Sequence, residues 1–293
     1  MRFPIDAAEL VTTIGAGAAD YFASVSHGAL RLRFESGGDV MMTIDDGPQQ
    51  CVAHARAGTV PGEVVLAVAD AEHAADQPGG FGVAGDASTA GAAYIGANDV
   101  ADPSTPPPLD LVEHELGHAL GWVHSGDDGT AEVSGRYRCA TDVMSDSAAP
   151  RSVDATRRDG PDTLAIDRYL VGWIPRTEVA VVGGSRGSVA LAPSTGGVVE
   201  GAHRLAVVPL DDGRFATVEV LDAAGYDAHL PETGVAVHVV TVIGGAVTAI
   251  EPVHDDSPCT DLLGAGDSLD IPGHELRVGV AVDGVVTVVV AAR

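Results

Sequence analysis

The residues best suited to chemistry stand together in one stretch of eleven residues, H-E-L-G-H-A-L-G-W-V-H. On a helix, His114 and His118 are one turn apart and point to the same side, so their imidazoles can share one metal ion. Glu115 can reach a water molecule on that metal and act as a general base. Gly121 lets the chain leave the helix sharply and bring His124 round as a third ligand. Three neutral imidazoles leave one tetrahedral position open, as in a catalytic zinc site.

A helix is what the surrounding hydrophobic pattern predicts. One apolar stripe lies opposite the two helical histidines, at a rotation of roughly 100° per residue. The stripe consists of Leu109, Val112, Leu116, Ala119 and Leu120. We therefore expect one side of the helix to pack into a core while the histidine side faces a cleft. The alternative is a core helix that carries its histidines by chance, and the length of the motif argues against it.

The long motif resembles the signature of the metzincin zinc endopeptidases, in which a Met-turn follows the third histidine. A candidate for this turn is the segment from Thr141 to Asp146. If the resemblance holds, Met144 lies beneath the zinc as a hydrophobic floor and is not a ligand. The stretch R-Y-L-V-G-W-I at residues 168–174 also resembles the bacterial immune-inhibitor and algal gametolysin branches of this group. The resemblance implies a two-lobed zincin domain that holds one catalytic zinc ion.

The resemblance also implies a place for the substrate. In metzincins a strand at the upper rim of the cleft pairs with an extended peptide through main-chain hydrogen bonds. By that resemblance, the strand that contains Ala92, Ala93 and Tyr94 is the candidate substrate-binding edge, and an ordinary sheet strand is the alternative. Two features depart from related branches. Asp146 stands where the astacin and serralysin branches carry a tyrosine, so no tyrosine ligand is expected there, and no cysteine-switch segment of the matrixin type precedes the motif.

Other patterns before residue 175 predict the elements that could position such a site. An apolar face with helical spacing predicts a helix over residues 6–25. Alternating apolar and polar residues predict a strand over residues 29–35, and a continuous apolar run predicts a buried strand over residues 64–69. Helical spacing returns over residues 162–171. We therefore place the metzincin-like zinc protease domain at residues 1–175.

From residue 176 onward the patterns change to short strands without helices. Turn-forming Gly, Asp and Pro residues separate these strands, and Asp283–Gly284 is a hairpin signal. The predicted strands span residues 178–182, 188–191, 202–209, 215–221, 234–242, 274–282 and 285–291. Such a series predicts an all-β sandwich domain over residues 176–293. The expected fold class of the chain is thus α+β.

Charge restricts the partners. The 293 residues include 42 acidic and 16 basic side chains, which gives a formal net charge of -26. This charge argues against nucleic acid and anionic membranes as partners, and no apolar run is long enough to span a bilayer. We expect a monomer that acts on a protein or peptide.

The first residues lack the pattern of a signal peptide. We expect a secreted, extracellular protein whose leader has been removed, with a cytoplasmic protein as the alternative.

Further ligand types give weaker signals. The three cysteines, Cys51, Cys139 and Cys259, allow one disulfide, and the sequence leaves its pairing open. Calcium could bind the acidic pairs Asp99/Asp102, Asp127/Asp128 and Asp255/Asp256, although solvated loop carboxylates are the alternative. The remaining histidines show no ligand spacing, so we expect surface or hydrogen-bonded side chains. They are His27, His54, His73, His203, His229, His238, His254 and His274.

Together these patterns predict a zinc-dependent endopeptidase, with zinc on His114, His118 and His124 and with Glu115 as the general base. Two alternatives stay open. The chain could be a dedicated cytosolic processing protease for one precursor peptide. It could also be a non-catalytic binding module on a zincin scaffold, which a missing ligand or a missing glutamate would favour. Neither residue type is missing from the motif.

Overall fold

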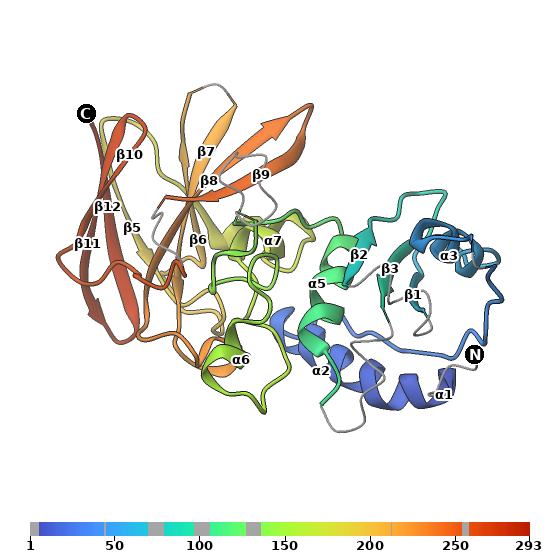
Figure 1. Ribbon diagram of the computed structural model, residues 1–293. Coiled ribbons are helices and arrows are strands. Elements are labelled where there is room, and N and C mark those ends of the chain that lie inside the picture. Colours follow the sequence, from blue (N-terminus) through green and yellow to red (C-terminus); the bar gives the residue numbers. More distant parts are fainter. Residues whose placement is uncertain are drawn as a thin grey trace. The chain divides into compact units, whose positions relative to one another are not determined.

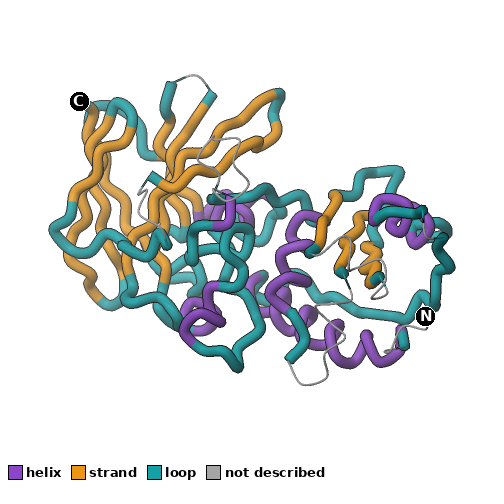
Figure 2. Tube along the Cα trace, in the orientation of Figure 1, coloured by secondary structure: helices purple, strands orange, loops and turns teal. Residues whose placement is uncertain are grey.

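The computed structural model describes residues 6–43, 45–69, 79–96, 106–126, 136–211, 213–253 and 258–293. The chain is of mixed α+β class, as expected (Figure 2). It divides into two compact units. Unit 1 contains residues 1–122 and 150–160, and unit 2 contains residues 123–149 and 161–293. The acidic pairs considered for calcium lie outside the described residues, as do His73 and His254.

Unit 1 contains helices and one three-stranded sheet (Figure 1). Its helical segments are α1 (Ala7–Leu10), the π-helical turn η1 (Val11–Gly15), α2 (Ala16–Val25), α3 (Pro48–Ala55) and α5 (Leu109–Ala119). Its strands are β1 (Val64–Val68), β2 (Gly80–Val83) and β3 (Gly91–Ile95). The first three segments follow one another without a break, which confirms the helix predicted over residues 6–25. The short helix α6 (Ala149–Val153) begins the segment that returns to this unit.

The central strand of this sheet is β3, which corrects the expected substrate edge. Strand β3 pairs with β1 in parallel and with β2 in antiparallel register, so both of its edges are occupied. The side chains of Ala92 and Tyr94 pack with Val52 of α3 in one buried cluster. The expectation that residues 92–95 offer an unpaired edge is therefore wrong. Among the described strands of this sheet, β2 is the one with an open edge next to α5.

The strand predicted over residues 29–35 is also wrong, because that segment pairs with no other strand. The alternation that suggested it is nevertheless visible as alternating burial. Leu30, Leu32 and Phe34 are half-buried, and the residues between them are exposed. Phe34 packs against the helix at Gly15, where an added Cβ atom would lie 2.8 Å from the Phe34 Cβ atom. The apolar side therefore covers a helix instead of joining a sheet.

Unit 2 contains two sheets, one with the strand order β4-β6-β7-β8-β9 and one with the order β10-β11-β12-β5. The strands are β4 (Val179–Val181), β5 (Arg186–Leu191), β6 (Leu205–Pro209), β7 (Arg214–Leu221), β8 (Gly234–Ile243), β9 (Ala246–Pro252), β10 (Ser268–Ile271), β11 (His274–Val282) and β12 (Val285–Ala292). All seven predicted strands are present, and β9 and β10 are additional. One buried apolar cluster takes side chains from both sheets, including Val218, Val237, Leu276 and Val288.

Helix α7 (Ala165–Leu170) belongs to unit 2, so the units divide at other positions than the boundary expected near residue 175. Leu164 and Ile166 pack with Val240 and Ile250 in one apolar cluster. The helix predicted over residues 162–171 is thus confirmed but shorter, and its apolar side packs on the β sheet. No helix in the described ranges is both long and apolar enough to cross a bilayer.

Candidate metal centre

Three histidines that the sequence predicted as ligands come together in the structure. A nitrogen atom from each of His114, His118 and His124 lies within 4.8 Å of the other two, close enough to hold one metal ion. The rings of His114 and His118 lie edge to face with centroids 4.8 Å apart, as expected one turn apart on α5. In the part of the chain that the structure describes, no other group of three His, Cys, Asp or Glu residues is arranged in this way.

The end of α5 fixes the second histidine. Gly121 has a φ of +96°, a conformation that favours glycine, and its amide donates to the His118 carbonyl at 3.0 Å. The turn also places the Trp122 carbonyl 2.9 Å from Nδ1 of His118. A carbonyl oxygen can only accept, so Nδ1 carries the proton and Nε2 is left to bind a metal. Burial lowers the pKa of His118, which favours the neutral, ligating form.

Glu115 is buried beneath strand β2. A Cβ atom on Gly80 would lie 2.7 Å from Glu115 Cγ, and one on Gly82 would collide with the Glu115 carbonyl and His118 Cβ. Only glycine lets the strand approach α5 so closely. Burial raises the pKa of Glu115 to about 8, and its Oε2 has no hydrogen-bond partner among the described residues. The carboxyl group is therefore buried, and one of its oxygens is available to take a proton or to interact with a cation.

The other charged residues of α5 hold the segment that returns to unit 1. Asp110 forms an ion pair with Arg151, and its amide donates to the Arg158 carbonyl at 2.6 Å. The Gly160 amide donates to Glu113 at 2.8 Å. Burial raises the pKa of Glu113 well above its usual range. Most residues of helix α5 are buried, including His114, whereas the sequence predicted that the histidine side of the helix faces a cleft.

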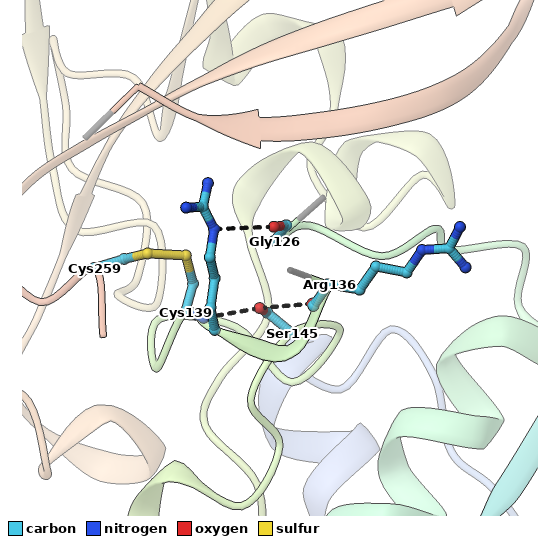
Figure 3. The surroundings of a disulfide bond; sticks show 6 residues. Gly126, Arg136, Cys139, Ser145 and Cys259 are labelled. Carbon is cyan, nitrogen blue, oxygen red and sulfur yellow. Dashed lines mark hydrogen bonds between the residues drawn. A yellow bond between two sulfur atoms is a disulfide. The ribbon is translucent and has the colours of Figure 1, made fainter. Parts of the chain in front are cut away.

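A disulfide fixes the predicted Met-turn. Cys139 and Cys259 are bonded, which resolves the pairing that the sequence left open (Figure 3). The Cys139 amide donates to Ser145 Oγ at 3.0 Å, and this hydroxyl donates to the Arg136 carbonyl at 3.0 Å. Met144 is completely buried. Its carbonyl accepts a hydrogen bond from the Ser125 amide at 3.3 Å, directly after the third histidine. Its predicted place beneath the metal stays a prediction.

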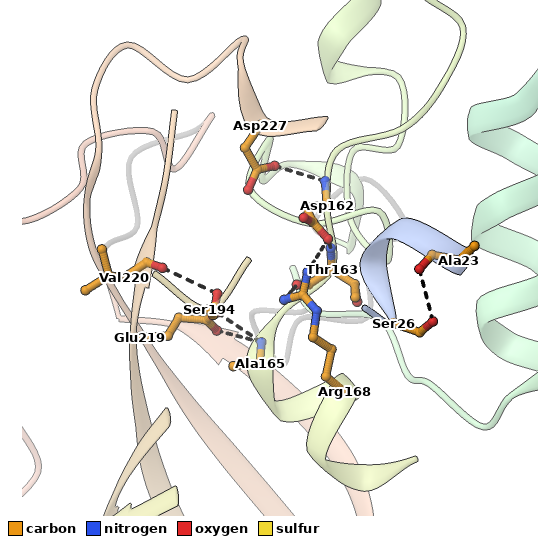
Figure 4. Close-up of polar contacts among 10 residues, drawn as sticks. All are labelled: Ala23, Ser26, Asp162, Thr163, Ala165, Arg168, Ser194, Glu219, Val220 and Asp227. Atoms are coloured by element: carbon orange, nitrogen blue, oxygen red, sulfur yellow. Dashed lines mark hydrogen bonds and ion pairs between the residues drawn. The ribbon is translucent and has the colours of Figure 1, made fainter. Parts of the chain in front are cut away.

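Buried charges join the predicted Met-turn to the β sheet. The Val143 amide donates to the Asp162 carbonyl at 3.1 Å, and the Asp162 carboxylate pairs with Arg168. The Asp162 amide donates to Asp227 at 2.9 Å, while Glu219 of β7 accepts the Ala165 amide at 3.0 Å (Figure 4). Burial raises the pKa of Glu219 to about 7 and that of Asp227 well above its usual range.

Sequence reasoning missed Gly80, Gly82 and this group of carboxylates. The two glycines stand in the G-G-F-G run of residues 79–82, which could have indicated a close approach of backbone to another element. The carboxylates come from segments far apart in the chain, and no local pattern marks them.

The donor set fits zinc. Three imidazoles are available without a thiolate or a carboxylate ligand, and this set leaves a position open for water or substrate in tetrahedral coordination. The orphaned oxygen of Glu115, the residue that follows the first histidine, fits a site that takes up a cation. Three histidines alone do not identify the metal, because imidazole also suits copper, iron and nickel.

Comparison with protein-family models, with curated proteins and with solved structures gave no match to this chain.

Proposed function

We propose that this protein is a zinc-dependent endopeptidase of the metzincin type. The observation that carries the proposal is the convergence of His114, His118 and His124 next in sequence to a buried Glu115, whose Oε2 has no hydrogen-bond partner among the described residues. The finer fold assignment belongs to the same proposal: a zincin-like catalytic part, and a β-sandwich made by the two sheets of unit 2. The Cys139–Cys259 disulfide supports an extracellular location, because disulfides persist in oxidising compartments.

The chain's own residues have defined roles in this proposal. Zinc, when bound by the three histidines, polarises a carbonyl oxygen and makes a water molecule more acidic. Glu115 takes the proton of the attacking water and passes it to the leaving amine. It must be ionised to do so, and a nearby divalent cation favours the ionised form over the protonated form that burial alone stabilises.

We place the substrate along strand β2, and no longer along β3 as the sequence suggested. Its outer edge is not paired with another described strand, and its inner face lies against α5 at Glu115 and His118. An extended peptide that adds to this edge forms main-chain hydrogen bonds and needs no particular side chains. We therefore propose a protein or peptide substrate bound in extended conformation along Gly80–Val83.

The test is cleavage of a peptide library by the zinc-loaded chain, compared with two variants of neighbouring glutamates. Glu115→Gln keeps the shape but removes the base, so we expect unchanged zinc content and a loss of cleavage rate of about 10²–10⁴-fold. Glu113→Gln is the matched control. Glu113 is fully buried and accepts the Gly160 amide, and the side-chain oxygen of glutamine can accept the same hydrogen bond, so cleavage stays near wild type.

Two results would contradict the proposal. Undiminished cleavage by Glu115→Gln would show that this residue is not the base. A zinc-loaded wild-type chain that cleaves no library peptide would favour the non-catalytic zinc-binding module instead.

A further inference from the structure

An aromatic ring lies against the third histidine. The rings of His124 and Tyr137 meet edge to face, with centroids 5.1 Å apart and planes at 83°. Aromatic pairs favour this arrangement, because the positive edge of one ring faces the electron-rich face of the other. His114 and His118 are placed by helix α5, whereas His124 follows the end of that helix on a loop. The contact with Tyr137 therefore restrains the ligand that the helix does not.

Tyr137 is held beside His124 by its neighbours in the chain. Arg138, the next residue, donates from Nε to the Gly126 carbonyl at 3.2 Å. A Cβ atom on Gly126 would lie 2.7 Å from the carbonyl oxygen of Arg136, the residue before Tyr137. The two segments are thus in direct backbone contact just after the third histidine.

The loop that carries Tyr137 is anchored in turn. Cys139 is bonded to Cys259, and its amide donates to Ser145 Oγ at 3.0 Å (Figure 3). The same hydroxyl donates to the Arg136 carbonyl at 3.0 Å. These contacts fix the main chain on both sides of Tyr137, so its ring stands on a rigid support.

We propose that Tyr137 is a positioning residue for the metal site: its ring packs edge to face on the His124 imidazole and holds this third ligand in the direction that metal binding needs. The inference rests on the metal-binding part of the proposed function and does not depend on hydrolysis. The aromatic ring has this role, and the phenol hydroxyl does not. For His118 the corresponding role belongs to the Trp122 carbonyl, which lies 2.9 Å from Nδ1.

Three substitutions separate the ring from the hydroxyl group and from general stability. Tyr137→Ala removes the ring, and we expect zinc affinity to fall by about 2–10-fold, the factor that one aromatic pair contributes. Tyr137→Phe keeps the ring, so its zinc affinity should equal that of wild type. Tyr226→Ala is the second control and should bind zinc as wild type does. Tyr226 is a partly buried tyrosine of the same unit, in the turn η5 (Gly225–Asp227).

The experiment measures the Zn²⁺ affinity of the full chain by competition with a chelating dye, and records the visible spectrum after Co²⁺ loading. Urea denaturation of the metal-free chains shows whether a variant is merely less stable. In Tyr137→Ala we expect weaker binding and shifted Co²⁺ bands. Its denaturation midpoint should stay unchanged, because Tyr137 is 44% exposed and little of the core depends on it. In Tyr137→Phe both metal readouts should return to the wild-type values.

Other outcomes overturn the inference. Wild-type affinity in Tyr137→Ala, or a loss in Tyr137→Phe as large as that in Tyr137→Ala, would show that the ring does not position His124. An equal loss in Tyr226→Ala, or a lowered midpoint with an unchanged Co²⁺ spectrum in Tyr137→Ala, would show a role in folding alone.

The experiment also separates this inference from the proposed function. A wild-type chain that binds neither Zn²⁺ nor Co²⁺ would contradict both together. A wild-type chain that binds metal without cleaving peptides would contradict the proposed function alone.

Discussion

At the scale of single residues, the candidate site could be predicted where its chemistry is local. His114, Glu115 and His118 are fixed by the geometry of one helix, and Gly121 brings His124 close within three further residues. The glycines of β2 could not be predicted in this role, since only the packed structure shows which atoms a side chain would meet.

The close approach of β2 to α5 makes Gly82 sensitive to substitution. In Gly82→Ala the new Cβ atom would collide with the Glu115 carbonyl and His118 Cβ, so the strand or the helix must shift. We expect the free energy of unfolding to fall by about 1–3 kcal/mol, together with weaker zinc binding. Gly37→Ala is the control, because nothing lies within 4 Å of its Cβ position. Equal urea denaturation midpoints for the two variants would contradict the packing described for β2.

At the scale of elements, hydrophobic periodicity predicted whether a segment is buried better than it predicted its partners. Strand β11 has the predicted bounds, because alternation reflects a sheet with one side in the core. Residues 29–35 have the same alternation but cover a helix, and β3 lies inside its sheet instead of at the edge. Pairing depends on residues far away in the sequence, which a local pattern does not contain.

Among the contacts between segments, the disulfide is the one whose loss we expect to lower the free energy of unfolding most. Cys139 and Cys259 are 120 residues apart, and their bond restrains a long loop of the unfolded chain. Replacement of both by serine should lower the free energy of unfolding by about 2–5 kcal/mol. The same variant should weaken zinc binding, because the segment that carries Met144 is no longer cross-linked. Cys51→Ser, outside the disulfide, is the control in thermal denaturation and zinc titration. If both variants match wild type, the cross-link is not what holds this loop.

At the scale of the whole molecule, the chain combines a net charge of -26 with several carboxylates buried in unit 2. Glu219, Asp167 and Asp227 are almost fully enclosed, and burial raises the pKa of each. The positive charge of Arg168 lies among them and lowers the pKa of Asp167 and Glu219, but by less than burial raises it. Composition predicted the acidity of the chain. It could not predict that several carboxylates are buried close together, because an isolated acidic residue in the sequence carries no sign of whether it is buried.

These buried acids predict stability that falls as pH rises. The pKa of Glu219 is raised from 4.5 to about 7, so its share of stability is complete below pH 4.5 and is lost as pH rises through 7. Such a shift corresponds to roughly 3 kcal/mol. Glu219→Gln imitates the neutral acid, so its advantage over wild type in unfolding free energy should grow between pH 4.5 and 7 and then level off. Parallel curves for the two metal-free proteins in urea denaturation would refute this.

The central claim is that three histidines form one open metal site, and X-ray absorption at the zinc edge of the loaded full chain tests it most directly. The account predicts one tightly held zinc per chain, with three imidazole nitrogens and one further light atom at about 2.0–2.1 Å. His124→Ala should lose one imidazole from this shell. His274 of β11 is half-buried, its Nδ1 lies 3.1 Å from the Pro272 carbonyl oxygen, and it is not one of the three clustered histidines, so His274→Ala should leave the shell unchanged. A sulfur neighbour at about 2.3 Å, or fewer than three imidazoles in the wild-type chain, would contradict the account.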